Sequence, residues 1–269
     1  MMKIQIGPLV GKGNTADVYD IGDNKVLKLF HPSLNQYAVV KEWENSKLIN
    51  SLNLPIVKSY DLITYEDRYG IILDKLQGIA LIDFILQPKK LDHQDGENYT
   101  LILAQIHKRL LEQTLPEATS FKSILRECIQ TTHYIKEQSK VKLLEILDSL
   151  PEGDQLCHGD FHFGNVIMDG NDYYVIDFMN ICKGNKYFDI ARTLYLIEMT
   201  VLPSDIPDYE LILSLKQEVG DIYLNEMGVS REELSDYLTV IAAARLAELN
   251  SNLGGELSGI LEYLSQKGL

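Results

Sequence analysis

The stretch that decides the fold of this chain is residues 158–165, which read His158-Gly159-Asp160-Phe161-His162-Phe163-Gly164-Asn165. A second segment follows a few residues later, Val175-Ile176-Asp177-Phe178. The apolar run and the turn signal at residues 169–172 that separate them predict a β-hairpin. This hairpin is expected to set Asn165 opposite Asp177 at its open end, with Asp160 close by on the preceding loop.

The residue types at these three positions suit one kind of chemistry. Mg²⁺ prefers oxygen ligands and shares its coordination shell with substrate phosphates, so Asn165 and Asp177 are candidate metal ligands. A carboxylate just outside that shell, here Asp160, can take a proton from an attacking hydroxyl. Asp and Asn are also common in loops for local reasons. The combined spacing, ending in an Asp after an apolar strand, nevertheless favours a phosphoryl-transfer site.

Composition limits the classes of protein that the chain can belong to. It has 269 residues, enough for one large domain or two lobes, and 45% of them are hydrophobic. The net charge of −14 argues against non-specific nucleic-acid binding and favours cationic ligands, although an ordinary acidic surface explains it equally well. Three cysteines without metal-ligand spacing predict reduced thiols in a cytoplasmic protein. No apolar run is long enough to predict a membrane span or a signal peptide.

The N-terminal part carries two features that suit a bound phosphate. The Gly-rich stretch of residues 11–16 lies between expected strands, where backbone N–H groups can approach a phosphate. Lys28 shares the apolar face of its strand with Val26 and Phe30, so it needs an anionic partner or a route to water. Glu42 and Glu44 on the next helix are both candidate partners, and Glu44 is preferred because it lies one turn before an apolar position.

The pattern of secondary structure changes near Gln77. The first third predicts strands near Ile4 and Ile6 and then at residues 18–21, 25–30, 56–65 and 69–73, with one helix over residues 33–52. Apart from the hairpin, later segments predict helices over residues 101–111, 187–199, 208–227, 231–250 and 257–264, and one or two helices over residues 121–150. The predicted class is therefore α+β, with a β-rich N-terminal lobe of residues 1–76 and a mainly helical C-terminal lobe of residues 77–269.

With these features in place, the chain resembles the aminoglycoside phosphotransferase/choline kinase-like family, which has a bilobal protein-kinase-like fold. The resemblance spans about residues 8–195. Its most specific part is the 158–165 motif with Asp177. Its other parts are residues 11–19, Lys28, Leu54-Pro55, residues 73–78, Ile106-His107, Val175-Ile176-Asp177-Phe178, Gly184 and residues 188–191.

The resemblance implies an ATP- and Mg²⁺-dependent kinase for a small hydroxylated molecule, with GTP as a second nucleotide to consider. Asp160 would be the catalytic base, and Asn165 and Asp177 would bind the metal. Asp189 would brace the catalytic loop, and His158 would pack against it. The nucleotide would be held by Gly11, Gly13, Asn14, Thr15, Lys28, Glu44 and the backbone of Asp74, Lys75 and Leu76.

Three other interpretations stay open. The acidic balance suits an aminoglycoside-resistance kinase in particular. A nucleotide-binding pseudokinase or regulatory module would have the same fold without turnover. A zinc hydrolase could use His158, Asp160 and His162 with Asp177, although this would leave Lys28 and the Gly-rich stretch unexplained. The sequence does not identify the phosphate acceptor or the oligomeric state.

Overall fold

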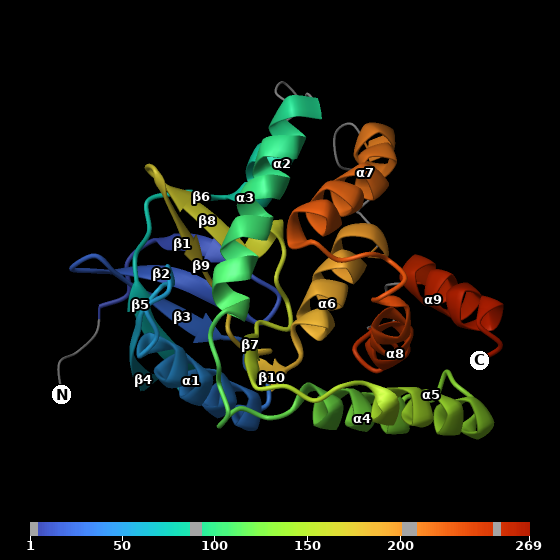
Figure 1. Cartoon of the computed structure of the whole chain (residues 1–269). Coiled ribbons are helices and arrows are strands. Elements are labelled where there is room, and N and C mark those ends of the chain that lie inside the picture. Colours follow the sequence, from blue (N-terminus) through green and yellow to red (C-terminus); the bar gives the residue numbers. More distant parts are fainter. Residues whose placement is uncertain (1–4, 87–92, 201–208, 250–253) are drawn as a thin grey trace. The chain divides into compact units, whose positions relative to one another are not determined.

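The computed structural model describes residues 5–86, 93–200, 209–249 and 254–269, which form two compact units (Figure 1). The first unit joins residues 1–81 to residues 164–180, and the second joins residues 82–163 to residues 181–269. The predicted hairpin therefore groups with the N-terminal strands, although it is far from them in the sequence. The division into lobes of residues 1–76 and 77–269 stays a prediction.

The first unit is built on an antiparallel sheet of five strands in the order β1-β2-β3-β5-β4. These strands are β1 (Leu9–Lys12), β2 (Ala16–Gly22), β3 (Lys25–Phe30), β4 (Ser59–Tyr65) and β5 (Arg68–Asp74). Two-residue turns at Asp23-Asn24 and Glu66-Asp67, all with positive φ, join β2 to β3 and β4 to β5. Such left-handed turns match the twist of paired strands, which explains the strength of the turn signals in this part of the sequence.

The start of the chain differs from the prediction. Among the described residues the first strand is β1, so the strand expected near Ile6 is wrong, and Ile4 lies outside the described residues. Gly11 is part of β1, which shortens the Gly-rich turn to Gly13-Asn14-Thr15. The Gly13 N–H closes this turn by donating to the carbonyl of Ala16 at 2.9 Å.

Helix α1 (Gln36–Asn50) packs against β4 and β5 of the same unit. It begins later than the predicted residue 33, because the Asn35 side chain caps its first turn by accepting from the Tyr37 N–H. It also ends before the predicted residue 52, with Ser51 as its C-cap. Its buried face contains polar as well as apolar side chains. These buried residues are Val39, Glu42, Asn45, Ser46 and Ile49.

A second, three-stranded sheet completes the first unit, with the order β6-β8-β9. Its strands are β6 (Ile79–Ala80), β8 (Val166–Asp169) and β9 (Asp172–Val175). The β8–β9 hairpin is confirmed, with Asp169 paired to Asp172 across a two-residue turn that starts at Gly170. Before β6, Gly78 lies so close to β8 that a Cβ there would be 1.9 Å from the carbonyl oxygen of Met168. Only glycine fits this approach.

The second unit is mainly helical, as predicted. Its helices are α2 (Leu81–Ile85, whose first residue falls in the first unit), α3 (His93–Leu111), α4 (Phe121–Thr131), α5 (Glu137–Ser149), α6 (Lys186–Glu198), α7 (Tyr209–Met227), α8 (Ser235–Arg245) and α9 (Gly254–Gln266). Two short antiparallel strands that the sequence did not predict, β7 (Gln155–Cys157) and β10 (Cys182–Gly184), pair beside them. A 3₁₀ turn, η1 (Phe163–Asn165), contains the point in the sequence where the chain passes from the second unit to the first.

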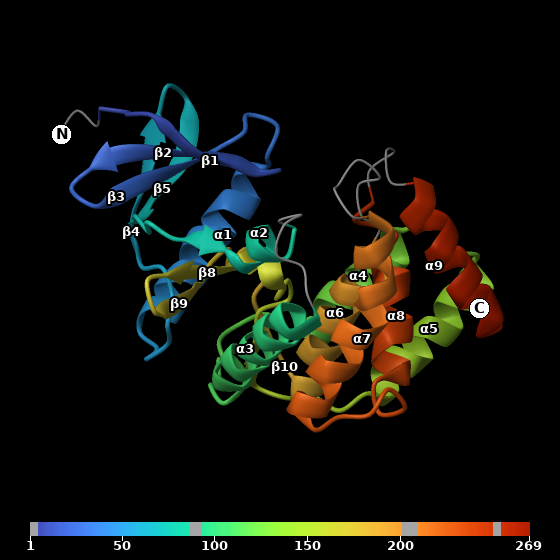
Figure 2. The same cartoon turned by 90° about the horizontal axis from the view of Figure 1, so that it is seen from above.

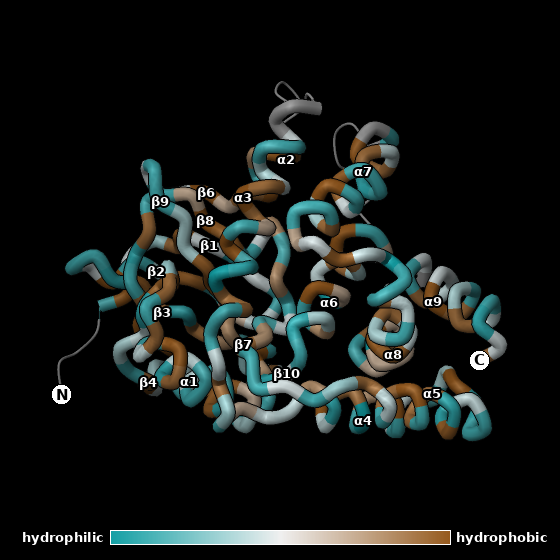
Figure 3. The backbone as a smooth tube through the Cα atoms, viewed as in Figure 1, coloured by the Kyte–Doolittle hydropathy of each residue, from teal (hydrophilic) through white to brown (hydrophobic). Residues whose placement is uncertain are grey.

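Helix α8 is the centre of the helical unit, in contact with α4, α5, α6 and α9 (Figure 2). Its run from Thr239 to Ala244 is buried on all sides, as expected for a helix inside a core. Along α4 and α5, hydrophobic and hydrophilic segments alternate (Figure 3), which is typical of helices with one buried face. The predicted α+β class is confirmed. Within the described residues, no helix combines the length and apolarity that crossing a membrane requires.

Candidate active site

A buried ion-pair cluster in the first unit is centred on Lys28 of β3. The Lys28 ammonium lies 2.7 Å from Glu42 Oε1 and 3.1 Å from Asp177 Oδ1. The Lys28 and Glu42 side chains are 12% and 5% exposed, whereas Asp177 is 38% exposed. The cluster therefore joins a strand, a helix and the segment after the hairpin, and it presents one carboxylate to solvent.

The surroundings keep Lys28 charged. Burial alone would lower its pKa, but the carboxylates of Glu42 and Asp177 outweigh burial and raise the pKa of Lys28 above its ordinary value. Burial raises the pKa of Glu42, and Lys28 offsets that shift only in part. Among the described residues, no donor reaches the buried second oxygen of Glu42. Glu42 and Asp177 therefore hold the Lys28 ammonium in place and keep it protonated.

The preference for Glu44 as the partner of Lys28 is wrong. Glu42 makes the ion pair, and Glu44 is exposed. The prediction failed because it took the apolar residues of α1 as its inner face. The buried face of α1 carries Glu42 and Asn45, three residues apart. Glu44 is not part of that face.

The β8–β9 hairpin positions Asn165 and Asp177, with a register one residue away from the prediction. The last ladder pair is Val166 with Val175, and the Ile176 N–H then donates to the carbonyl of Asn165 at 3.0 Å. Asn165 thus lies opposite Ile176, and Asp177 is the next residue along. Asp177 has φ of 64°, a left-handed conformation that Asp tolerates better than most residues. Asn165 is buried.

The candidate nucleotide-binding residues also lie in the first unit. In the Gly-rich turn, Gly13 and Asn14 are exposed. The Asp74 and Lys75 N–H groups donate to the carbonyls of Lys58 and Asn24, each at about 3 Å, so both amides are already committed to the edge of the sheet. Any backbone contact to adenine from Asp74, Lys75 and Leu76 must therefore use a group other than the N–H of Asp74 or of Lys75.

In the second unit, helix α6 clamps the loop of residues 158–161. The Asp189 carboxylate accepts the N–H groups of His158 and Gly159 at 2.7 and 2.8 Å. Arg192 Nε donates to the Gly159 carbonyl at 3.1 Å, and Thr193 Oγ1 donates to the Phe161 carbonyl at 2.9 Å. Gly159 has φ of +76°, which glycine adopts without strain. The loop is therefore fixed on both sides of Asp160.

The expected bracing by Asp189 is confirmed, and it extends into a buried network. His107 Nε2 lies 3.0 Å from Asp189 Oδ2, and the other ring nitrogen lies 2.7 Å from the hydroxyl of Tyr223. Burial would raise the pKa of Asp189, but hydrogen bonds from His107 and the Gly159 amide help to hold it below its ordinary value. Asp189 is therefore a buried anion that organises this loop.

Sequence reasoning missed Arg192 and Thr193. Arg192 is buried and donates from its guanidinium to Glu248 Oε2 at 2.9 Å, which secures the arginine from the C-terminal side of the chain. A signal was present in the sequence. Asp189, Arg192 and Thr193 are polar residues at positions i, i+3 and i+4, which share one face of a helix, in an otherwise apolar segment. Such a polar stripe on a buried helix indicates side chains that bind backbone groups.

Asp160 belongs to the second unit, whereas Lys28, Asn165 and Asp177 belong to the first. The structure brings Lys28 and Asp177 together, and the approach of Asp160 to them stays a prediction. Asp160 Oδ2 is 3.8 Å from His162 Nε2. Among the described residues, no three His, Cys, Asp or Glu side chains gather as metal ligands, so no observation favours the zinc interpretation.

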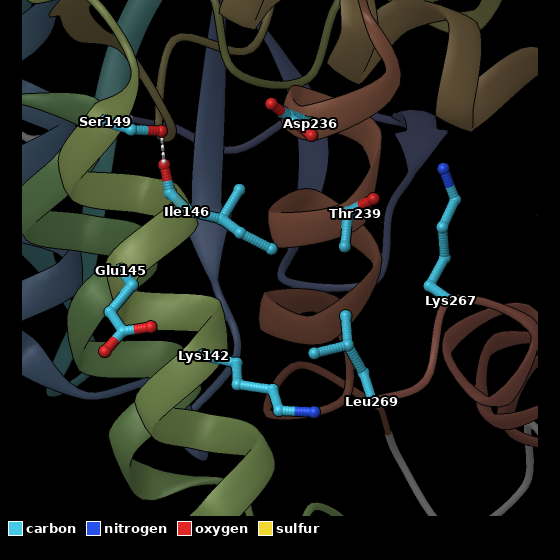
Figure 4. Close-up of a pocket in the computed structure, with 8 residues that line it drawn as sticks. All are labelled: Lys142, Glu145, Ile146, Ser149, Asp236, Thr239, Lys267 and Leu269. Atoms are coloured by element: carbon cyan, nitrogen blue, oxygen red, sulfur yellow. Dashed lines mark hydrogen bonds between the residues drawn. The ribbon is translucent and has the colours of Figure 1, made fainter.

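A cavity of about 530 Å³ lies between α5 and α8 in the second unit (Figure 4). Lys142 and Ile146 of α5 face Thr239 of α8 across it, and Lys267 and Leu269 close one side. None of the predicted site residues lines this cavity. It is therefore not the place where the chemistry predicted above would occur.

Comparison with known proteins agrees with the resemblance seen in the sequence. A family model for the phosphotransferase enzyme family matches residues 7–213, well over half of the chain. This range includes Lys28, the loop of residues 158–161, Asp177 and Asp189. No curated protein is similar enough in sequence to count as a relative.

Solved structures share the fold along nearly the whole chain. An amicoumacin kinase, hAmiN, in complex with AMP-PNP, Ca²⁺ and Ami is 14% identical with a TM-score of 0.62, over 98% of this chain and 88% of that one. The ADP-bound aminoglycoside phosphotransferase APH(2″)-Ib is 16% identical with a TM-score of 0.56, over 97% and 93%. A choline/ethanolamine kinase family protein from Mesorhizobium loti is 12% identical with a TM-score of 0.59, over 97% and 87%. At these identities the likeness is one of fold, and it confirms the predicted protein-kinase-like class.

Proposed function

This chain belongs to the phosphotransferase enzyme family, and we propose that it transfers the terminal phosphate of ATP to a hydroxyl group of a small molecule. The observation that carries the proposal is the placement of Lys28, a buried lysine held at 2.7 Å by Glu42 and at 3.1 Å by Asp177. A lysine oriented by a helix glutamate is a known device for holding the phosphates of ATP. GTP is the alternative phosphate donor.

The residues of the first unit fit a bound Mg²⁺. Asp177 offers a carboxylate that is 38% exposed, and Asn165 offers an amide oxygen, which are the hard oxygen donors that Mg²⁺ prefers. When bound, the ion neutralises charge on the phosphates. Lys28 holds the same phosphates from the side of the sheet. Gly11, Gly13, Asn14 and Thr15 cover the phosphates, and the 74–76 backbone faces the adenine.

In this proposal Asp160 accepts the proton of the acceptor hydroxyl as that oxygen bonds to the terminal phosphorus, whose bond to the bridging oxygen breaks so that ADP leaves. The loop clamp supports this role, because Asp189 and Arg192 fix the backbone before Asp160 and Thr193 fixes the backbone after it. We also propose that residues 1–76 bind the nucleotide and that residues 77–269 supply the base and bind the acceptor. The three free thiols agree with a cytoplasmic protein.

The function is tested by measuring ADP release against a panel of hydroxyl compounds with Mg²⁺ present. The panel starts with aminoglycosides and amino alcohols, because the similar structures include an aminoglycoside phosphotransferase and a choline/ethanolamine kinase family protein. The net charge of −14 also favours cationic acceptors. We expect at least one compound to stimulate ADP release in a Mg²⁺-dependent way. Nucleotide binding without acceptor-dependent release across the panel would instead identify a pseudokinase.

Replacing Lys28 by methionine tests the observation that carries the proposal. Loss of a charged donor to the phosphates, worth roughly 1.5–3 kcal/mol, should weaken ATP binding about 10–100-fold. Lys58→Met is the matched control, since Lys58 is exposed in the same unit. Calorimetric titration gives the affinities, and fluorescence of the single tryptophan, Trp43 of α1, reports whether the variant folds. Equal ATP affinity in a folded Lys28→Met protein would contradict the role of Lys28.

A further inference from the structure

Asn45 of α1 makes two hydrogen bonds to the segment that follows Asp177. Its side-chain amide donates to the carbonyl of Phe178 at 3.1 Å and to the carbonyl of Met179 at 3.2 Å. Asn45 is only 8% exposed, so these bonds form where water does not compete freely. One amide group therefore satisfies two successive carbonyls directly after the candidate metal ligand.

Asn45 and Glu42 lie on the same buried face of α1, three residues apart. Glu42 holds Lys28 at 2.7 Å, and Lys28 contacts Asp177 at 3.1 Å. Asn45 holds the backbone just beyond Asp177. One face of α1 thus fixes both partners of the Lys28–Asp177 contact. Glu42 holds Lys28 through an ion pair, and Asn45 holds the backbone that follows Asp177.

The backbone at Asp177 needs such support. Its φ of 64° is a left-handed conformation that costs energy in a non-glycine residue and persists only when neighbouring contacts enforce it. Before this residue, Val175 donates to the carbonyl of Pro55 at 2.8 Å and Ile176 donates to that of Asn165 at 3.0 Å. After it, the Asn45 amide binds the next two carbonyls, so the turn is held from both ends.

We propose that Asn45 is a positioning residue for Asp177, fixing the turn of residues 177–179 so that the carboxylate is presented to the metal ion and to Lys28. The inference rests on the proposed function for the role of Asp177. Both of these Asn45 hydrogen bonds go to backbone carbonyls, so its effect on the metal is exerted through the backbone. Partners that orient metal ligands in this way contribute about 10–100-fold to metal affinity.

Asn45→Asp tests the proposal with little change in shape, because a carboxylate presents an acceptor to the Phe178 and Met179 carbonyls in place of a donor. We expect the Mn²⁺ concentration that half-saturates the protein–AMP-PNP complex, followed by electron paramagnetic resonance, to rise about 10–100-fold. Amide hydrogen exchange of residues 177–180 in the nucleotide-free protein should also accelerate. AMP-PNP affinity measured without metal should change little.

Asn50→Asp is the matched control. Asn50 lies on the same helix and donates to the Ser59 carbonyl at 2.6 Å, so it loses a similar bond at a distance from Asp177. This variant should retain the parent's Mn²⁺ affinity and its exchange at residues 177–180. The proposal fails if Asn45→Asp behaves like the parent, or if both variants lose metal affinity equally. If the parent itself binds no Mn²⁺ with AMP-PNP, the proposed function fails, and exchange at residues 177–180 still decides whether Asn45 fixes the turn.

Discussion

Asp160→Asn should lower kcat by about 10²–10⁴-fold, the usual contribution of a positioned general base. An amide has nearly the same shape as the carboxylate but cannot accept the acceptor's proton at neutral pH. The loop should keep its conformation, since its hydrogen bonds with Asp189, Arg192 and Thr193 involve the backbone of residues 158–161 and not the Asp160 side chain. The loss should therefore appear in kcat, with the KM for ATP nearly unchanged.

The measurement is steady-state ADP release with the best acceptor from the panel, for Asp160→Asn and for Asp154→Asn. Asp154 is an exposed carboxylate a few residues earlier in the same unit, and its replacement should leave kcat within about twofold, as for ordinary surface changes. Full turnover by Asp160→Asn would show that another group takes the proton. In that case the metal and phosphate assignments in the first unit would still stand on their own tests.

The sequence predicted those parts of the fold that local patterns determine. The hairpin at residues 166–175 was predictable because Asp169-Gly170-Asn171-Asp172 is a strong turn signal between two apolar runs. The helices of the second unit were predictable from their periodicity, except for the short α2 and the first turns of α3. The pair β7 and β10 was not, because each strand has only three residues and its partner lies more than twenty residues away. Such short, distant pairing depends on the surrounding helices.

The candidate site shows the same limit. Lys28 stood out as a charge on an apolar strand, which is a local signal. Its true partner, Glu42, did not, because the inner face of α1 mixes polar and apolar residues and periodicity alone misplaced that face. Asn45, Arg192 and Thr193 act on backbone groups far away in the sequence. Only the folded chain reveals which buried polar residues find such partners.

Asp189→Asn should strongly destabilise the second unit. The Asp189 carboxylate accepts hydrogen bonds from His158 and Gly159 amides and lies 3.0 Å from His107, with no exposed surface. An asparagine keeps one acceptor oxygen and turns its NH₂ group toward donors. Loss of two hydrogen bonds to a buried charge, at roughly 1.5–3 kcal/mol each, gives a decrease of about 3–6 kcal/mol in the free energy of unfolding.

Urea unfolding followed by far-ultraviolet circular dichroism is the suitable measurement, because it reports on the helices whereas Trp43 lies in the first unit. Asp221→Asn is the control, since Asp221 pairs with Arg231 but is 59% exposed, and its loss should cost less than about 1 kcal/mol. An Asp189→Asn protein as stable as the control variant would show that the carboxylate is not needed to hold the loop.

The stability difference between the parent and Asp189→Asn should also depend on pH. The pKa of Asp189 in the folded protein lies below its ordinary value of 3.8, so its charge stabilises the fold fully above about pH 4. That contribution is lost as the pH falls through the lower folded-state pKa, because the parent's own carboxylate then becomes protonated. The stability difference between parent and Asp189→Asn should therefore be constant between about pH 5 and 7 and shrink below about pH 4. A difference that stays constant down to full acid unfolding would mean that Asp189 holds the loop without its charge.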